Sequence, residues 1–264
     1  MIYKSIKHKT AIITGASEGI GRAIAENLAK NGAKILLISR DEKKLLKLKS
    51  YLKKKYSSKV EILAGDVKDT TLSKKIVDNT KSFFGNCDIL INNAGGPPPG
   101  SFLDHSDEIW NEYFNQNLLS IIRLTKLVVP QMKKNKWGRI INVTSSLAKE
   151  PTPNMVLSAT MRAGVSAFTK SISIELASKG ITVNTVCPGG VLTNRLINLV
   201  KISAKSSNKP YKQLLKESES QIPIGRFASP EEFANTVTFL ASEEGCYITG
   251  VSLMVDGGLT KSIF

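Results

Sequence analysis

Residues 10–25 read TAIITGASEGIGRAIA, an apolar run of strand length that passes through three glycines into a helical pattern. Gly15 allows a tight turn, Gly19 lets backbone N–H groups approach a pyrophosphate, and Gly21 permits close packing of a helix on a sheet. The positive end of the helix dipole then faces the turn. The spacing G-x-x-x-G-x-G differs from the commoner dinucleotide pattern, so taken alone it leaves open an ordinary strand-to-helix turn.

Strand-length apolar runs alternate with helical segments along the rest of the chain. Strands are expected at Thr10–Thr14, Lys34–Ser39, Val60–Ala64, Asp88–Ile91, Arg139–Ser145, Thr182–Val186 and Val251–Val255. Helices are expected at Gly19–Lys30, Asp41–Lys55, Thr71–Phe83, Asp107–Lys134 and Ser158–Ser178. This alternation predicts an α/β fold, with a parallel sheet covered by helices on both faces and joined by right-handed crossovers.

Three segments interrupt this alternation. Gly95–Gly100 reads GGPPPG and is expected to be an irregular loop, because proline lacks the N–H group and glycine is too free. Glu150–Pro153 predicts a second turn. Thr193–Pro223 is a long insertion, expected to be partly helical around Pro210–Glu219 with Pro210 at the first helical position. Because ligands bind where the strands of such sheets end, we expect a substrate site bordered by Gly95–Gly100, Glu150–Met155 and Thr193–Pro223.

Length and composition narrow the class of protein. The 264 residues, 41% hydrophobic and 22% charged, suit one large or two small globular domains. The cysteines Cys87, Cys187 and Cys246 show no paired spacing, which predicts reduced, buried thiols, and two histidines disfavour a metal centre. No apolar run is long enough to span a membrane and residues 1–10 lack the apolar stretch of a secretory signal. We therefore expect a soluble cytoplasmic protein without a membrane partner.

The formal net charge of +15 raises the question of nucleic acid, because basic surfaces attract phosphate. However, 30 of the 37 basic residues are lysines, whereas base and phosphate recognition usually uses the arginine fork. The lysines gather in polar helical stretches such as Lys43–Lys59 and Lys201–Lys216, which are typical of solvated helix faces. We expect no nucleic-acid partner, and a basic nucleic-acid-binding module is kept as the weakest alternative.

The end of the second expected strand bears on the choice of cofactor. An NAD site would place a carboxylate there to hold the adenosine ribose, but the strand ends in Ser39. Arg40 follows and is suited to a 2′-phosphate, which favours NADP(H) over NAD(H). An alternative interpretation is a capping box with Ser39 as N-cap and Glu42 reaching back, and the two interpretations are compatible.

Several motifs together resemble the short-chain dehydrogenase/reductase family. They are TGASEGIG at residues 14–21, AGDV at 64–67, NNAG at 92–95, GRIINVTSS at 138–146, ITVNTVCPGG at 181–190 and VDGG at 255–258. The blocks occur in the family's order over residues 9–258 and look most similar to 3-oxoacyl carrier-protein reductases. The resemblance implies one Rossmann-type, doubly wound domain over residues 1–264 with a seven-stranded parallel sheet, a substrate-loop insertion at 193–223, and assembly as a homo-oligomer, a tetramer or a dimer.

The resemblance also implies roles for individual residues in binding the cofactor. Asp66 would bind the adenine, Asn93 and Gly95 would flank the ribose, and Thr193 would contact the nicotinamide and its phosphate together with Pro188 and Val191. The full set of cofactor residues expected is Gly15, Ser17, Glu18, Gly19, Ile20, Gly21, Ser39, Arg40, Asp66, Val67, Asn93, Ala94, Gly95, Arg162, Pro188, Gly189, Val191 and Thr193.

The catalytic positions depart from the family's pattern. Hydride transfer to a carbonyl leaves an alkoxide that needs a proton, and the family supplies it from a Tyr one helical turn before a Lys, Y-x-x-x-K. Asn117 and Ser145 match the family's Asn and Ser, with Ser146 as the alternative for the Ser. Counting back from ITVN at 181–184 places the Tyr position on Ser158 and the Lys position on Arg162, so the motif reads S-x-x-x-R. No tyrosine stands between Tyr113 and Tyr211, so no local shift restores it.

Two functions remain open. The first is an NAD(P)(H)-dependent oxidoreductase acting on a carbonyl or alcohol, possibly 3-oxoacyl-like, in which a water held by Ser158, Ser145 and Asn117 replaces the phenol. Arg162 would then stand as a permanent cation over the nicotinamide ribose, because a guanidinium hardly loses its proton. The second is an NADP(H)-binding sensor or partner subunit with impaired catalysis.

Overall fold

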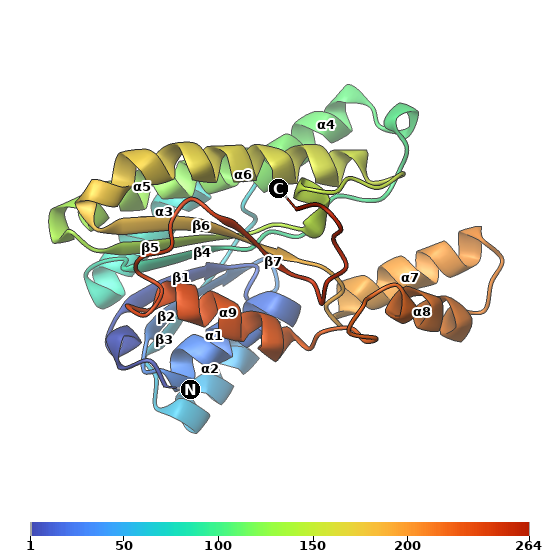
Figure 1. Ribbon diagram of the computed structural model, residues 1–264. Coiled ribbons are helices and arrows are strands. Elements are labelled where there is room, and N and C mark those ends of the chain that lie inside the picture. Colours follow the sequence, from blue (N-terminus) through green and yellow to red (C-terminus); the bar gives the residue numbers. More distant parts are fainter. Residues whose placement is uncertain (1, 264) are drawn as a thin grey trace.

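Seven parallel strands form a single sheet within residues 2–263, the part of the chain that the computed structural model describes. The strands are β1 (Thr10–Thr14), β2 (Lys34–Ser39), β3 (Val60–Ala64), β4 (Ile89–Asn92), β5 (Gly138–Val143), β6 (Ile181–Pro188) and β7 (Ser252–Val255). Their order is β3-β2-β1-β4-β5-β6-β7 (Figure 1). The chain therefore starts in the middle, runs outward through β2 and β3, and returns to β4, so the order reverses between β1 and β4, where such sheets bind ligands. The predicted fold class is confirmed.

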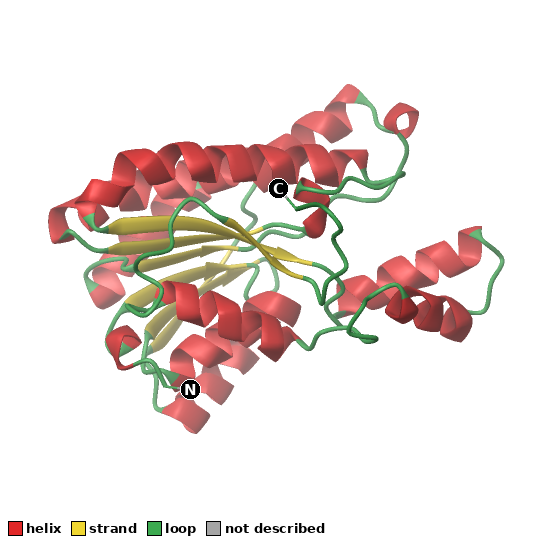
Figure 2. Ribbon diagram, viewed as in Figure 1, coloured by secondary structure: helices red, strands yellow, loops and turns green. Residues whose placement is uncertain are grey.

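Helices cover both faces of the sheet (Figure 2). One face packs against α1 (Gly19–Lys30), α2 (Glu42–Tyr56) and α9 (Pro230–Ala241). The other packs against α3 (Leu72–Phe84), α5 (Ser120–Asn135) and α6 (Val156–Leu176). The sequence analysis did not identify α9, although Ser229 and Glu232 form a capping box around Pro230 at its first turn. That pattern is a helix-start signal, and it could have found the helix.

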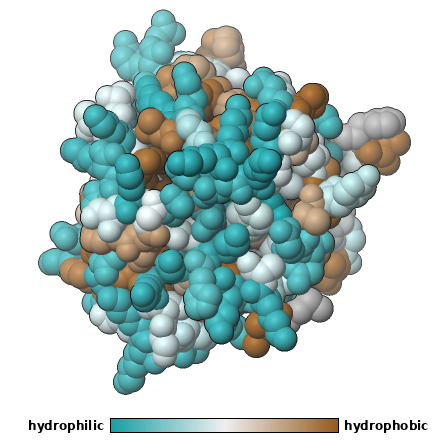
Figure 3. Space-filling view, turned by 90° about the vertical axis from the view of Figure 1, so that its left-hand side faces the viewer, coloured by the Kyte–Doolittle hydropathy of each residue, from teal (hydrophilic) through white to brown (hydrophobic). Residues whose placement is uncertain are grey.

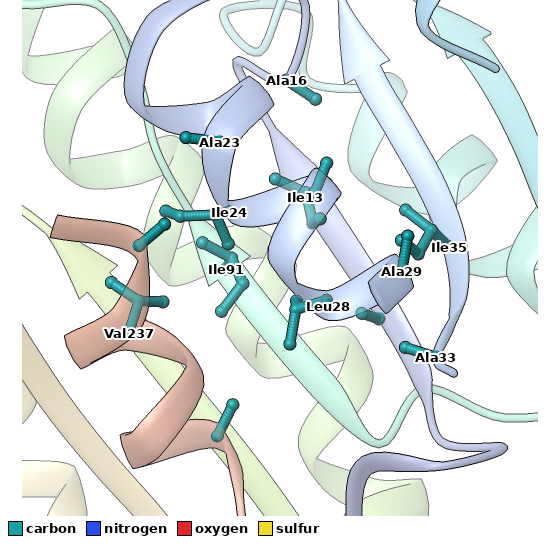
Figure 4. Close-up of a cluster of buried hydrophobic side chains, with 14 of the residues drawn as sticks. Ile13, Ala16, Ala23, Ile24, Leu28, Ala29, Ala33, Ile35, Ile91 and Val237 are labelled. Carbon is teal, nitrogen blue, oxygen red and sulfur yellow. The ribbon is translucent and has the colours of Figure 1, made fainter. Parts of the chain in front are cut away.

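The core lies on the two sides of the sheet and explains why the strands read as continuous apolar runs. Successive strand residues point to opposite faces, so Ile13 joins the cluster with Leu28 of α1 and Val237 of α9, while Ile12 joins the cluster with Val128 of α5. Figure 4 shows Ile13, Leu28 and Val237 converging between strand and helices. A strand buried on both faces carries no polar alternation.

The segments expected to border a substrate site project beyond the carboxyl ends of the strands. The insertion contains two packed helices, α7 (Asn194–Ser206) and α8 (Tyr211–Ser220), which extend from the body of the molecule (Figure 1). The prediction of one helix around 210–219 was incomplete, because α7 was missed. Pro210 is the N-cap of α8 and not its first helical residue.

One expected helix is interrupted. Asp107–Lys134 divides into α4 (Asp107–Phe114), a π-helical stretch (Asn115–Leu119) and α5. A π-helical turn widens the helix by one residue and is frequent at functional sites. The interruption lies at the same end of the sheet as α7 and α8 (Figure 1).

The surface fits the interpretation of solvated lysine faces. Figure 3 views the molecule from the left-hand side of Figure 1 and shows hydrophilic residues over most of that face, with hydrophobic ones scattered between them. All three cysteines are free. Cys87 and Cys187 are buried as expected, but Cys246 is exposed, so the expectation of burial was wrong for that residue.

Candidate dinucleotide and substrate site

The glycine turn after β1 has the backbone of an anion cradle. Gly15 and Gly19 adopt φ of 57° and 55°, in the left-handed region that favours glycine. A Cβ on Gly21 would lie 2.2 Å from the Gly15 carbonyl oxygen, so α1 packs directly on the turn. Glu18 is the N-cap of α1 and its side chain makes no capping hydrogen bond. The first N–H groups of α1 are thus left to a ligand, as at phosphate-binding helix starts.

Glu18 brings a carboxylate to this turn, and Lys44 balances its charge. Lys44 Nζ lies 2.8 Å from the Glu18 carboxylate. Hydrogen bonds from Lys44, and from the Asn194 side chain at the start of α7, hold the pKa of Glu18 below its usual value. On the other wall, Thr193 Cγ2 lies 3.2 Å from where a Cβ on Gly19 would stand. The turn is therefore enclosed by α7, and the neighbouring Ser17 and Ile20 are partly buried, with Ile20 packed on the core.

The end of β2 corrects one prediction. Asp41, not Ser39, is the N-cap of α2, and its carboxylate accepts a hydrogen bond from the Lys44 amide at 3.0 Å. The capping-box interpretation was wrong, because α2 begins only at Glu42, two residues later than a Ser39 N-cap requires. The Ser39 hydroxyl is buried and has no hydrogen-bond partner among the described residues. A buried, unsatisfied hydroxyl at this edge is a polar group available to a ligand.

Arg40 and Asp66 lie beside each other at the ends of β2 and β3. The Arg40 side chain is 77% exposed and its Nη1 is 3.9 Å from Asp66 Oδ2. Asp66 also accepts a hydrogen bond from the Lys68 amide at 3.0 Å, which fixes the loop. Because so exposed a pair is weakly held, Arg40 is free to turn toward a ligand phosphate. Val67 lines a water-sized cavity of about 10 Å³ that Asn93 and Ala94 also border.

The residues that follow β4 form hydrogen bonds to the glycine turn and to Asn117 at the carboxyl ends of the strands. The Asn93 amide donates to Thr14 Oγ1 at 2.9 Å, and its side chain donates to the Gly15 carbonyl at 3.1 Å. The Gly95 carbonyl accepts a hydrogen bond from Asn117 Nδ2 at 2.8 Å. Asn117 is fully buried in the π-helical stretch, and its Oδ1 has no partner among residues 2–263. The loop thus joins the glycine turn to the predicted catalytic Asn.

Ser145 and Ser158 lie on neighbouring elements. β5 ends at Val143, two residues before the predicted end, and Ser145 caps the short 3-10 helix Ser146–Ala148 by accepting from the Leu147 amide at 3.3 Å. That short helix packs against α6, which carries Ser158. Ser158 is 4% exposed, and its hydroxyl makes no hydrogen bond within the described chain. Both hydroxyls therefore stand at the end of the sheet where the glycine turn lies.

Arg162 stands one helical turn after Ser158 and is 6% exposed. Its Nη1 donates to the Val143 carbonyl at 2.9 Å and its Nη2 reaches the Ala94 carbonyl at 3.5 Å, while Nε has no partner in the described region. Burial, together with the charge of Arg195, lowers the pKa of Arg162 to about 10. The guanidinium is thus charged at neutral pH, and no carboxylate within residues 2–263 pairs with it.

The last group of predicted cofactor residues lies at and just after the end of β6. Pro188 is the last residue of β6, and Gly189 packs on Asp256 so closely that a Cβ would lie 2.6 Å from the Asp256 Cβ. This packing explains why a glycine stands beside the VDGG block. Val191 is buried and bridges to Ala228. Thr193 is the N-cap of α7 and accepts from the Leu196 amide at 3.3 Å.

The three segments expected to border a substrate site do meet. Gly100 forms a bridge with Met155 and donates its amide to the Asn154 carbonyl at 2.8 Å. From the insertion, Arg195 Nη2 donates to the Pro97 carbonyl at 2.9 Å. The loop Gly95–Gly100 therefore lies between the turn before α6 and the start of α7, at the carboxyl ends of the strands.

A doubly wound parallel sheet with an uncapped glycine turn at its switch point, and unsatisfied polar atoms at the same edge, defines a dinucleotide-binding protein of the Rossmann type. The sequence model of the family described as enoyl-(acyl carrier protein) reductase matches residues 15–260. The chain belongs to the short-chain dehydrogenase/reductase family of oxidoreductases. The predicted resemblance and the reading as an oxidoreductase are confirmed.

Known relatives match almost the whole chain. The 3-oxoacyl-[acyl-carrier-protein] reductase of Escherichia coli (strain K12) is 37% identical over 251 residues, 95% of this chain and 97% of that protein. The L-sorbose reductase of Gluconobacter frateurii, solved with NADPH and L-sorbose, superposes with a TM-score of 0.94 at 35% identity, over 99% of this chain and 100% of that one. An NADPH-bound oxidoreductase of Pseudomonas aeruginosa PAO1, described as containing an atypical catalytic center, gives 0.87 at 31% identity, over 96% and 97%. Within residues 2–263, no helix has both the length and the apolar content needed to cross a membrane.

Proposed function

We propose that the protein is an NADPH-dependent reductase of carbonyl compounds, working without the phenol that its family uses as acid. The observation that carries the proposal is that two deeply buried polar atoms, Asn117 Oδ1 and Arg162 Nε, are left unsatisfied at the edge where the glycine turn presents free amides. Buried polar atoms are normally paired, so such a group of exceptions points to a ligand. The relatives solved with NADPH support the same cofactor.

The residues present fit this cofactor. The turn Gly15–Gly21 would hold the pyrophosphate, Ser39 and Arg40 the phosphorylated adenosine ribose, Asp66 the adenine and Arg162 the nicotinamide ribose. NADPH, when bound, supplies the hydride. No carboxylate ends β2, and the exposed Arg40 is available to the 2′-phosphate that distinguishes NADPH from NADH.

The polar side chains near the reacting carbonyl have different roles. Arg162 keeps its proton at neutral pH and acts as a fixed positive charge. The hydroxyls of Ser145 and Ser158 orient the substrate oxygen. A serine is shorter than a tyrosine and is a weaker acid, so a water held between Ser158 and Asn117 Oδ1 gives the proton to the developing alkoxide and is reprotonated from bulk solvent. The relative described as having an atypical catalytic center supports the view that this fold tolerates a changed catalytic center.

The direct test measures oxidation of NADPH by the purified protein with 3-oxoacyl thioesters, simple ketones and quinones. Turnover above a cofactor-only blank is expected with at least one class, and Ser158→Ala should lower kcat while leaving the Kd for NADPH unchanged. Ser171→Ala, in an exposed position of the same helix, is the matched control. No turnover in the whole panel would overturn the proposal.

A second candidate is an NADP(H)-binding sensor or partner subunit, favoured by the replacement of the Tyr and Lys positions by Ser158 and Arg162. It predicts tight binding of NADPH by the wild type, with catalysis only in the double variant Ser158→Tyr, Arg162→Lys. Robust turnover by the wild type removes this candidate. The double variant therefore separates a site that has lost its acid from a site that has replaced it.

We also propose that residues 1–264 form one domain, with Thr193–Pro223 as its substrate loop, working in the cytoplasm as a homo-oligomer, a dimer or tetramer. Exposed apolar surface on and beside the last strand of the sheet supports the proposal of an oligomer. This surface belongs to Tyr247, Ile174 and Leu253. β7 lies at the end of the strand order, so its outer edge pairs with no other strand among residues 2–263. Light scattering after size-exclusion chromatography gives the mass, and Tyr247→Glu should shift it toward the monomer.

A further inference from the structure

Arg195, in the first turn of α7, is a cation that the predicted site did not include. Its Nη2 donates to the Pro97 carbonyl at 2.9 Å, and its guanidinium lies so close to Gly96 that a Cβ there would be 2.5 Å from Nη2. The residue as a whole is exposed, whereas burial of its guanidinium lowers the pKa of that group. Only Nη2 makes a hydrogen bond within the described residues, which leaves the other guanidinium donors available to a ligand. Its charge reaches Arg162 and lowers the pKa of that residue.

The side chain of Arg195 faces the substrate loops and not the glycine turn. The residue before it, Asn194, makes its hydrogen bond to Glu18 at that turn. Successive residues of a helix point about 100° apart, because 3.6 residues make a turn. Asn194 therefore marks the side of the cofactor pyrophosphate, and Arg195 marks the side of Gly96 and Pro97.

Neither Arg162 nor Arg195 has a carboxylate partner within residues 2–263. The acidic side chains of the nearby loops are committed to backbone amides or to a lysine. They are Asp104 on the Ser101 amide, Glu150 on the Lys261 amide, Asp256 on the Gly258 and Thr260 amides, and Glu18 on Lys44. Two guanidinium groups at one site without a counter-ion are a binding site for an anion.

We propose that Arg195, with the charge of Arg162 behind it, binds a carboxylate of the substrate, so that the substrate is an oxo acid. The inference rests on the proposed reductase function and names its substrate class. Arg162 stands one helical turn from Ser158, which places the anion close to the reacting carbonyl. In this reduction the carbonyl carbon would gain the hydride that NADPH supplies on becoming NADP+. The carbonyl oxygen would gain a proton from the held water, which bulk solvent reprotonates, so a hydroxy acid leaves with its carboxylate unchanged. The planar fork of Arg195 suits a carboxylate, which accepts two parallel hydrogen bonds.

The test uses matched pairs of probes that differ in one charged group. Binding of acetoacetate and methyl acetoacetate to the complex with NADP+ is measured by calorimetry, and their reduction is followed by oxidation of NADPH. We expect the acid to exceed the ester by roughly 10- to 100-fold in affinity and in kcat/KM. Dihydroxyacetone phosphate and dihydroxyacetone form a second pair that separates a phosphate site from a carboxylate site.

Variants of Arg195 test whether this side chain is responsible for the preference for the acid. Arg195→Gln should remove the preference for the acid mainly through KM and leave the Kd for NADPH unchanged, while Arg195→Lys should keep part of the preference. Lys201→Gln, which removes one exposed charge from the same helix, is the matched control and should change neither. A loss of NADPH affinity in Arg195→Gln equal to the loss for acetoacetate would overturn the inference, because Arg195 would then bind the cofactor.

The other possible outcomes distinguish failure of the carboxylate site from failure of the reductase function. Equal binding of acid and ester, binding of neither, or a preference for the phosphate ester over acetoacetate each overturns the carboxylate site. Acid-selective binding that depends on Arg195 but occurs without turnover upholds the site and refutes the reductase. Turnover of both members of a pair at equal rates upholds the reductase and refutes the site.

Discussion

Two arginines lie almost fully buried at opposite ends of this sheet, and their surroundings differ. Arg139, in β5, is 2% exposed and donates to the carbonyls of Gly138 and Ser242 at 2.9 and 3.2 Å. It also pairs with the Glu243 carboxylate at 2.5 Å and lies 4.4 Å above the centre of the Trp137 ring. Arg162, at the carboxyl end of the strands, has two carbonyls, an unsatisfied Nε and no carboxylate within the described chain.

The difference shows which end of the sheet is built for a ligand. Burying a charge is costly unless it is paired and hydrogen-bonded. At the amino end of the strands the protein supplies the partners of Arg139 itself, and the Trp137 indole N–H donates to the same Glu243 at 2.9 Å. At the carboxyl end it leaves the charge of Arg162 uncompensated. An anionic ligand bound at that end would therefore interact favourably with the Arg162 charge, because the protein supplies no carboxylate to pair with it.

The largest expected effect is on stability, from Arg139→Met. The variant removes the donor to the carbonyls of Gly138 and Ser242, a longer hydrogen bond to the Gly180 carbonyl at 3.4 Å, and the partner of Glu243. We expect the free energy of unfolding to fall by about 2–4 kcal/mol. Glu243 is half-exposed, so water takes up part of its lost interaction. Urea denaturation at neutral pH measures the change, and Glu243→Gln should have a smaller effect. A loss below about 1 kcal/mol would show that Arg139 is not the better compensated arginine.

Arg162→Met is expected to affect cofactor binding strongly and stability little, in contrast to Arg139→Met. The variant loses two hydrogen bonds to backbone carbonyls, but it also removes a buried charge that no carboxylate compensates, and methionine fills a similar space. Because these effects oppose each other, the free energy of unfolding should stay within about 1 kcal/mol of the wild type. The affinity for NADPH should fall by roughly 10- to 100-fold, the value of one or two hydrogen bonds to a charged group. Denaturation and calorimetry on the same preparation check both. A destabilisation equal to that of Arg139→Met would end the contrast between the two sites.

The sequence predicted well whatever depends on local chemistry. The strands β1 to β7 were placed within two residues, because their apolar runs and flanking turns are local signals. The glycine turn was predicted because the left-handed backbone of Gly15 and Gly19 favours glycine. The expected positions of Asn117 and Arg162 followed from motif spacing, and the structure brings both to the same edge.

What escaped prediction depends on tertiary contacts. Arg195 belongs to no motif, and only the fold shows that it reaches Pro97 across the site. The π-helical stretch Asn115–Leu119 has the same periodicity as a helix, so the sequence gives no sign of the interruption. The N-cap of α2 shifted to Asp41 because Ser39 is still held in the sheet beside Ala64. The charge left without a partner at Arg162 is likewise visible only when every neighbour is known.

The smallest effect is expected at a third arginine, which is matched and exposed. Arg226 pairs with Glu232 through both nitrogens, at 2.8 and 2.6 Å. This pair and the Ser229 amide lower the pKa of Glu232 from 4.5 to about 2, with the hydrogen bond from Arg226 as the largest cause. Because the folded state has the lower pKa, the stabilisation is present above about pH 4.5 and is lost as the pH falls toward 2.

Glu232→Gln therefore tests whether an exposed, compensated arginine matters only while its partner is ionised. The midpoint of thermal unfolding should be lower than that of the wild type at pH 7, and the gap should narrow steadily between pH 4.5 and 2.5. Glu231→Gln, beside it on α9 and without an ion pair among the described residues, should show no such narrowing. A gap that stays constant with pH would mean that Glu232 acts through the geometry of the capping box and not through its charge, because the amide of glutamine also accepts hydrogen bonds but carries no charge.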